Sequence, residues 1–304
     1  MALYNKITII GLGLIGSSIA RGIKERKIAN HLNAYEKNSV FVKTIDELGL
    51  VDALATDLKS AVKDADLIIL ATPVGTYENI GKIIGPHIKE GATLSDVGSI
   101  KAAVFGMLEP SLSDKVHFIP AHPVAGTEKS GPAAGFSSLF HDRWAIITPA
   151  KGVDEQALER LTTFWEMLGS NVEIMDANHH DKVLAITSHV PHLIAYNIVG
   201  TARDLEEVTK SEVIKFSAGG FRDFTRIAAS DPTMWRDVFL NNKEAVLEML
   251  GRFSEDLTAL QRAIRWEDGD ALYDIFEKTR RIRKQIIDAG QEEDLENFGR
   301  SNDD

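Results

Sequence analysis

A polar stretch from Ala121 to Gly131, AHPVAGTEKSG, holds residue types that indicate chemistry. It follows an apolar segment, Val116 to Ile119, that we expect to be a strand, and it shows no apolar periodicity of its own, so we expect a loop. Loops at strand ends hold catalytic groups because a rigid scaffold aims them. His122 suits a proton acceptor, since the ordinary pKa of histidine is about 6.5. A loop histidine held by backbone hydrogen bonds is the alternative.

A second stretch, Gly11 to Gly16, reads GLGLIG and has the spacing of a dinucleotide-binding motif. We expect a buried strand before it, Lys6 to Ile10, and a helix after it, Ser17 to Lys27. In this order the glycines allow a tight turn, close approach of a pyrophosphate and close helix packing, while the helix N-terminus offers N–H groups to phosphates. The expected cofactor contacts in this stretch are Gly11, Leu12, Gly13, Leu14, Ile15 and Gly16, and further along the chain they are Glu36, Thr72, Pro73, Val74 and Ser99.

Glu36 directs this prediction toward NAD. It ends a second expected strand, Leu32 to Tyr35, about 20 residues after the last glycine of the motif. A carboxylate there accepts hydrogen bonds from the ribose of NAD and repels the 2′-phosphate of NADP. The neighbouring Lys37 leaves NADP open.

Alternating strands and helices continue along the chain and predict a parallel, doubly wound α/β sheet. Ligands of such sheets bind outside the carboxyl ends of the strands. Four loops therefore converge on one crevice: Gly11 to Gly16, Thr72-Pro73-Val74, Val97 to Lys101, and Ala121 to Gly131. In the third loop, Ser99 is placed to hydrogen-bond a substrate hydroxyl or the nicotinamide amide, and capping a helix is a compatible alternative. Trp144 to Thr148 and Val172 to Met175 are further expected strands, with a helix from Glu155 to Leu168 between them.

The pattern becomes helical after Asp176, which is a suitable helix cap. We predict a nucleotide-binding domain over 1–176, an all-α substrate and dimerisation domain over 177–290, and a disordered acidic tail over 291–304. Pro191 should kink the first helix and free a carbonyl near Thr187. Later helices are expected over Leu205 to Phe216, Asp231 to Trp266 and Glu267 to Ala289. The last two form a large amphipathic surface, so we expect a homodimer.

Two polar clusters lie in this helical part. Ser188-His189-Val190-Pro191-His192 places two histidines on one helix face, but no nearby carboxylate completes a metal site, so we expect no metal. We expect His192 to contact a substrate, with a core histidine as the alternative. His179 and His180 are expected at the solvated surface.

The second cluster, GGFRDFTR, ends at Arg226. An arginine between aromatic residues can bind a carboxylate through two parallel hydrogen bonds. This is the expected role of Arg222 and Arg226, and a structural pair with Asp223 is the alternative. Trp235 is expected to close a pocket or else to lie in the core.

The composition is that of an ordinary globular protein of about two domains, 304 residues long and 44% apolar. A net charge of -11 argues against a nucleic-acid partner. The absence of cysteine excludes a disulfide and a thiolate nucleophile. We see no targeting segment and no apolar run of membrane-spanning length, and so expect a cytoplasmic protein without a membrane partner.

Taken in order, GLGLIG, DVGSIK, HPVAGTEKSG, SHVPH, GGFRDFTRIAASDP and MWRD resemble the prephenate/arogenate dehydrogenase family over roughly Lys6 to Ala289. The resemblance implies an NAD-binding Rossmann domain followed by a helical dimerisation domain, as in the 6-phosphogluconate dehydrogenase group. It also implies oxidative decarboxylation in tyrosine biosynthesis. Hydride leaves ring C4 for NAD⁺, the ring carboxylate leaves as CO₂, and the ring becomes aromatic. Prephenate would give 4-hydroxyphenylpyruvate and arogenate would give tyrosine, and both substrates stay open.

The resemblance also assigns roles by motif. His122 would take the C4 hydroxyl proton, Ser99 would bond the same hydroxyl, and Arg226 would pair with the ring carboxylate. The substrate side chain would be surrounded by Thr127, Glu128, His192 and Arg222, with Trp235 capping the pocket from this or the other subunit. Glu128 bears most on the choice of substrate.

Two other functions match parts of the sequence. A β-hydroxyacid or imine reductase of the same plan needs a lysine on the long interdomain helix, where the stretch 178–199 offers only Lys182, near its start. A dinucleotide-sensing protein without chemistry would keep the glycine motif but would not need His122, Ser99 and Arg226 together.

Overall fold

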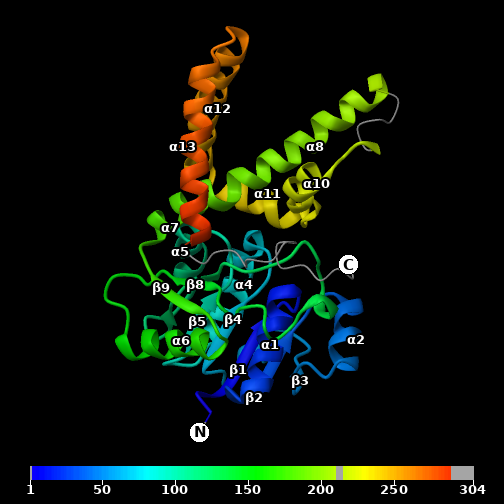
Figure 1. Ribbon diagram of the computed structural model, residues 1–304. Coiled ribbons are helices and arrows are strands. Elements are labelled where there is room, and N and C mark those ends of the chain that lie inside the picture. The colour runs from blue at the N-terminus through cyan, green and yellow to red at the C-terminus, as the bar shows by residue number, and fades with distance from the viewer. Residues whose placement is uncertain (1, 210–214, 289–304) are drawn as a thin grey trace. The chain divides into compact units, whose positions relative to one another are not determined.

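The structure, a computed structural model, describes residues 2–209 and 215–288. The chain divides into two compact units, Met1–Leu247 and Glu248–Asp304. The first unit contains both β-sheets and the helices that adjoin them (Figure 1). The tail 291–304, which we predicted to be disordered, lies outside the described residues. So does the middle of the helix predicted over 205–216.

Six parallel strands form the main sheet of the first unit, in the order β3-β2-β1-β4-β5-β6. They are β1 (Tyr4–Ile10), β2 (Ala29–Tyr35), β3 (Ala53–Leu54), β4 (Leu67–Leu70), β5 (Thr93–Asp96) and β6 (His117–Phe118). The chain runs from β1 outward to β3 and then returns to β4 on the other side of β1. The loops after β1 and β4 therefore lie at the point where ligands bind in sheets of this kind.

Helices cover both faces of the sheet (Figure 1). They are α1 (Leu14–Arg26), α2 (Ser39–Glu47), α3 (Leu58–Val62), α4 (Tyr77–Ile84), α5 (Ala102–Leu108) and α6 (Glu155–Met167). Alternate residues of a strand face opposite sides. Leu67 and Ile69 of β4 accordingly join the core with α1 and α6, whereas Ile68 and Leu70 join the core with α4 and α5. Both faces are buried, so the strand is apolar throughout, and the predicted doubly wound sheet is confirmed.

A second, three-stranded sheet contains His122. It consists of β7 (Ala121–Pro123), β8 (Trp144–Ile147) and β9 (Asn171–Ile174), with β7 antiparallel to β8 and β8 parallel to β9. The prediction of a loop from Ala121 was therefore wrong for its first three residues, because His122 pairs with Ile146. A strand of three residues is too short to show a period, and its partner lies more than 20 residues further on. The predicted strands β8 and β9 are present, but outside the parallel sheet.

The helical part of the first unit begins with α7 (Ala177–Leu184), a π-helical segment (Ala185–His189) and α8 (Val190–Thr209). Asp176 caps α7 as predicted, since its side chain accepts from the N–H groups of Asn178 and His179. Pro191 lacks an N–H group, and the turn just before it is widened, with the Val190 N–H bonded to the Ala185 carbonyl five residues back. The disturbance that Pro191 predicted is therefore a π-helical segment.

This continuous helix is longer and more apolar than the sequence analysis allowed. The helix Ala177–Asp204 has 28 residues and contains an 18-residue window with a mean hydropathy of 1.3, so by length and composition alone it could cross a membrane, contrary to the prediction that no segment is long enough. Such a helix is only a candidate, because the core helix of a soluble protein passes the same test. At its start, His180 and Asp181 are buried polar residues.

Two helices and a 3₁₀ turn follow in the first unit. They are α10 (Gly219–Thr225), the 3₁₀ turn Arg226–Ala229 and α11 (Pro232–Asn241). The sequence analysis assigned no helix to the first of these. The helix predicted over 231–266 is in fact two, because Asn242 leaves the helical conformation with φ −115° and ψ 32°. Neither glycine nor proline marks this break.

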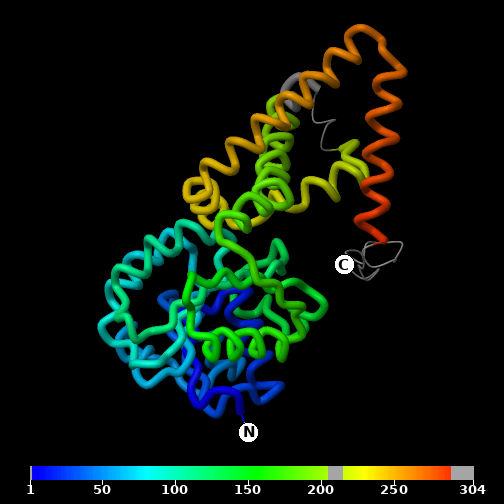
Figure 2. Tube along the Cα trace, turned by 90° about the vertical axis from the view of Figure 1, so that its left-hand side faces the viewer, coloured from blue at the N-terminus to red at the C-terminus, as the bar shows by residue number. Residues whose placement is uncertain are grey.

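The second unit contains most of α12 (Lys243–Arg265) and all of α13 (Gly269–Asp288), drawn in orange and red in Figure 2. Both helices expose large apolar side chains along their length. They are Leu257, Ile264, Tyr273, Phe276, Ile282 and Ile286. Such a density of exposed apolar groups indicates a surface made for a protein contact.

Candidate active site

The glycine motif forms a tight turn from β1 into α1. Gly11 has φ +90°, and a Cβ there would lie 2.7 Å from the Thr72 Cγ2 atom. A Cβ at Gly16 would collide with the Gly11 carbonyl oxygen, whereas Gly13 faces open space. Helix α1 begins at Leu14, three residues earlier than predicted, with neither a side-chain cap nor an acidic residue in its first turn. Its N-terminal N–H groups are therefore suited to a phosphate.

Glu36 lies beside this turn, as predicted. Its carboxylate accepts hydrogen bonds from the backbone N–H groups of Leu12 (2.9 Å) and Asn38 (2.8 Å). These bonds fix an acidic group at the carboxyl end of β2, next to the glycine turn. The Thr72 contact with Gly11 places the loop that contains Pro73 and Val74 on the other side of the same turn. The structure therefore brings Glu36 and the loop Thr72-Pro73-Val74 to the glycine turn.

A buried ion pair holds the loop after β5 against the start of β7. Lys101 Nζ donates to Asp96 Oδ2 (2.5 Å) and to the Ala121 carbonyl (2.8 Å), and both side chains are fully buried. The Ala121 N–H in turn donates to Asp96 Oδ1 (3.3 Å). Burial lowers the pKa of Lys101, and the Asp96 carboxylate opposes that shift. The pair fixes the backbone next to His122, and the sequence analysis did not identify it.

His122 lies in a chain of buried side chains. Its Nδ1 is 2.8 Å from His180 Nε2, and His180 Nδ1 is 2.8 Å from Asp181 Oδ1. The Asp181 carboxylate also accepts from the backbone N–H groups of Lys101 (2.7 Å) and Ala102 (2.9 Å). The prediction that His180 is solvated was wrong, because its side chain is fully buried. The helix start at Asp176 turns it toward the sheet, whereas His179 is exposed.

The surroundings of His122 keep its imidazole neutral. Burial is the largest cause that lowers its pKa well below 6.5, and the charges of His180, Lys101 and His189 lower the pKa further. An ordinary pKa, which the sequence analysis assumed, is therefore not what the structure shows. A neutral ring at neutral pH is the form that accepts a proton.

Ser99 and His189 meet next to this chain. Ser99 is half-buried after β5, and Lys101 occupies the N-cap of α5, so the capping alternative for Ser99 is not seen. His189 is fully buried, and its Nδ1 lies 3.1 Å from Asn242 Nδ2. Burial lowers the pKa of His189 to about 4, against a smaller opposing effect of Asp181 and of the Ser99 backbone. Sequence spacing alone gave no reason to single out His189.

Two of the predicted substrate residues form an ion pair. Arg226 Nη1 lies 2.7 Å from Glu128 Oε2, with 45% and 30% of the two side chains exposed. The pKa of Glu128 is lowered by a hydrogen bond from its own backbone N–H and by Arg226. Arg226 thus contacts the segment after β7. Thr127, next to Glu128, accepts a hydrogen bond from the Lys129 N–H.

His192 and Trp235 stack on each other, with ring centroids 3.7 Å apart and planes 25° apart. Trp235 is 5% exposed and belongs to the core that contains α4 and α5. Burial lowers the pKa of His192, and the Arg226 charge lowers it further, which places His192 beside the ion pair. Arg222 lies one turn before Arg226 and is exposed. The structure thus brings His192, Trp235 and Arg226 together, and Trp235 packs in the core, which was the alternative prediction for it.

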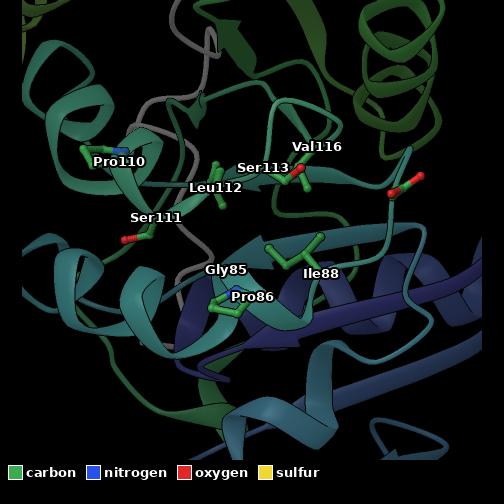
Figure 3. A pocket seen from close by; sticks show the side chains of 9 residues that line it. Gly85, Pro86, Ile88, Pro110, Ser111, Leu112, Ser113 and Val116 are labelled. Atoms are coloured by element: carbon green, nitrogen blue, oxygen red, sulfur yellow. The ribbon is translucent and has the colours of Figure 1, made fainter.

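A separate pocket of about 340 Å³ lies at the amino ends of the strands (Figure 3). Its lining residues Ile88 and Glu90 precede β5, and Val116 precedes β6. Because the loops described above follow the carboxyl ends of the parallel strands, the pocket is remote from them. Within 2–209 and 215–288, no group of three or more His, Asp or Glu side chains is arranged to hold a metal ion.

Comparison with known proteins gives a consistent result. Residues 19–174 match the model of the prephenate dehydrogenase nucleotide-binding domain, and residues 176–278 match that of the prephenate dehydrogenase dimerization domain. A cyclohexadienyl dehydrogenase of Zymomonas mobilis is 39% identical over 283 residues, which are 93% of this chain and 96% of that protein.

Solved structures agree. Prephenate dehydrogenase from Aquifex aeolicus, in complex with hydroxyphenyl propionate and NAD⁺, gives a TM-score of 0.86 at 33% identity, over 93% of this chain and 98% of that one. Synechocystis arogenate dehydrogenase gives a TM-score of 0.76 at 26% identity, over 92% and 99%. The resemblance predicted from the motifs is confirmed, and the chain belongs to the prephenate dehydrogenase family.

Proposed function

We propose that this oxidoreductase converts prephenate, arogenate or both by NAD⁺-dependent oxidative decarboxylation, with His122 as the proton acceptor. The observation that carries the proposal is the position of His122. It is a buried, neutral histidine on the three-stranded sheet, and the neighbouring Ala121 is bonded to Asp96 at the carboxyl end of β5 in the sheet that holds the glycine turn. A short segment joins His122 to the Glu128–Arg226 pair. The similarity to a cyclohexadienyl dehydrogenase, a prephenate dehydrogenase and an arogenate dehydrogenase supports the same reaction.

The residues of the glycine turn suit NAD. Gly13 leaves open space for a pyrophosphate, the start of α1 has free N–H groups, and Glu36 offers its carboxylate to a ribose. The complex of the Aquifex aeolicus relative with NAD⁺ supports this assignment. When bound, NAD⁺ would supply the hydride acceptor.

His122 would take the proton of the C4 hydroxyl, with Ser99 as a second hydrogen-bond partner of that oxygen. Loss of the C4 hydride, for which bound NAD⁺ would be the acceptor, would leave a carbonyl at C4. The bond from ring C1 to the carboxylate would then break with release of CO₂, its electron pair would enter the ring, and the C4 oxygen would recover the proton as a phenol. Because aromatisation drives this change, the chain mainly has to orient C4 and hold one proton. Both tasks require a fixed histidine, which the buried contacts of β7 provide.

Arg226 would bind the ring carboxylate. Its present partner, Glu128, is partly exposed, and such pairs contribute only about 0–1 kcal/mol. A substrate carboxylate can therefore replace Glu128 at small cost. Glu128 would then face the substrate side chain, where prephenate has a keto group and arogenate an ammonium group.

The test is an assay of NADH absorbance with purified protein, NAD⁺ and each substrate in turn. We expect turnover with at least one of them, and a loss of about 10²–10⁴-fold in the turnover number of His122→Asn with NAD⁺ affinity retained. Absence of turnover with both substrates would refute the reaction. Near wild-type turnover of His122→Asn would refute only the role of His122.

We further infer that the chain forms a homodimer through its C-terminal helices. The matched dimerization domain ends at residue 278, within α13. Apolar residues of α12 and α13 such as Leu257 and Phe276 are 44% and 58% exposed in the single chain. Covering them with a second copy removes a large apolar surface from water.

A further inference from the structure

We propose that His180 and Asp181 act as a positioning pair that fixes the tautomer of His122 and leaves its Nε2 as the proton acceptor. The proposal deepens the proposed function and rests on it. It is carried by two hydrogen bonds of 2.8 Å, from His122 Nδ1 to His180 Nε2 and from His180 Nδ1 to Asp181 Oδ1. All three side chains are buried, so water does not compete for these bonds.

The proton positions follow from the end of the chain of bonds. A carboxylate only accepts hydrogen bonds, so the bond to Asp181 requires a proton on His180 Nδ1. In a neutral His180 ring, Nε2 is then an acceptor. The proton between the two rings must therefore reside on His122 Nδ1. This leaves the lone pair of His122 on Nε2, the ring nitrogen outside this chain of bonds.

Asp181 is itself held in place by the backbone. The N–H groups of Lys101 and Ala102 donate to its two oxygens at 2.7 and 2.9 Å. They stand at the start of α5, whose dipole favours a negative charge. Asn242 Nδ2 donates to the Asp181 carbonyl at 2.9 Å, which fixes the backbone as well. The carboxylate therefore has no freedom to turn away from His180.

Charged and titratable groups from each neighbouring element surround His122 and His180. Lys101 before α5 and His189 from the π-helical segment act on His122, and Asp96 from β5 and Asp181 from α7 act on His180. Lys101 is paired with Asp96. Asp181 is the carboxylate connected to His122 by hydrogen bonds, through His180.

The decisive substitution is Asp181→Asn, which preserves shape but can donate to His180 Nδ1. His180 can then carry its proton on Nε2 and donate to His122, which places the His122 proton on the wrong nitrogen. We expect the turnover number to fall by about 10²–10⁴-fold, while NAD⁺ affinity and KM change by less than about threefold. The matched control is Asp176→Asn, on the exposed cap of the same helix, which should keep wild-type kinetics.

Two measurements separate positioning from a purely structural role. In a His122→Asn background, Asp181→Asn should lower turnover no further, because the pair acts only through His122. In protein with ¹⁵N-labelled histidine, nuclear magnetic resonance should show the His122 proton on Nδ1 in the wild type and on Nε2 in Asp181→Asn. Thermal unfolding of each variant checks that the fold is kept.

The outcomes also distinguish this proposal from the proposed function. If the wild type is inactive with both ring substrates, the reaction is wrong, and the resonance measurement still decides the tautomer. If the wild type is active but its His122 proton lies on Nε2, the positioning proposal is overturned. Additive losses in the double variant would overturn it as well. Should Asp181→Asn fail to fold, His180→Gln takes its place in the same two measurements.

Discussion

The buried His189 makes the stability of the protein fall as the pH falls below neutral. Its side chain is fully buried, and burial lowers its pKa from 6.5 to about 4. Between these two values the unfolded chain binds a proton at this position and the folded chain does not. The unfolded state then binds more protons, so the free energy of unfolding rises with pH and is lost on acidification.

The size of the effect follows from the two pKa values. Each pH unit inside the window contributes about 1.4 kcal/mol, so lowering the pH from 7 to 5 removes about 2 kcal/mol through His189 alone. Burial also lowers the pKa values of His122, His180 and His192, and these shifts act in the same direction. The wild-type loss should therefore be at least this large.

The assay is urea unfolding at pH 7, 6 and 5, followed by tryptophan fluorescence. His189→Gln loses the contact with the Trp235 ring and should be less stable at neutral pH. Its dependence on pH should nevertheless be weaker than that of the wild type by about 2 kcal/mol over the same interval. The matched control is His179→Gln, exposed at the start of the same helix, which should keep the wild-type dependence. An unchanged dependence in His189→Gln would refute the reasoning.

Three further predictions concern the cofactor, the substrate and assembly. Gly16→Ala should weaken NAD⁺ binding in a fluorescence titration, because the added Cβ collides with the backbone of the glycine turn. Gly106→Ala, where a Cβ meets open space, should leave the affinity unchanged, and equal NAD⁺ affinities of the two variants would contradict the prediction. Arg226→Ala should raise KM for the ring substrate far more than the dissociation constant of NAD⁺, and parallel losses would exclude the carboxylate clamp. Light scattering should give the wild type a mass of about twice 33.5 kDa, and Phe276→Glu should shift it toward the mass of the monomer. Lys278→Glu on the same helix should leave the mass unchanged, and a monomeric wild type would contradict the homodimer.

The sequence predicted the parts of the fold that rest on local patterns. The spacing of Gly11, Gly13 and Gly16 predicted a strand, a tight turn and a helix, because few other structures require glycines at this spacing. The unbroken apolar sequence of β4 predicted that both faces of this strand are buried. The caps Asp176 and Asp231 marked helix starts because their side chains bond N–H groups two and three residues on. The cytoplasmic localisation stays a prediction.

What the sequence did not predict depends on contacts between distant segments. His180 stands next to exposed His179, and both look alike in a polar helix start, yet only one turns toward the sheet. Strand β7 is recognisable only from its pairing with β8. At the helix break, the Asn242 side chain bonds the Asp181 carbonyl and lies beside His189, about 60 and 50 residues earlier. No local rule reports such a partner.

The same distant contacts explain why the site needs the helical part of the chain as well as the sheet. Strand β7 positions His122, but the two groups bonded in line with it, His180 and Asp181, come from α7. Asp181 in turn holds the start of α5 in the nucleotide-binding part. A shift of α7 would therefore move both the proposed proton acceptor and the helix that follows the Ser99 loop. On this proposal the first turns after Asp176 belong to the active site, although the predicted boundary of the nucleotide-binding domain lies at residue 176.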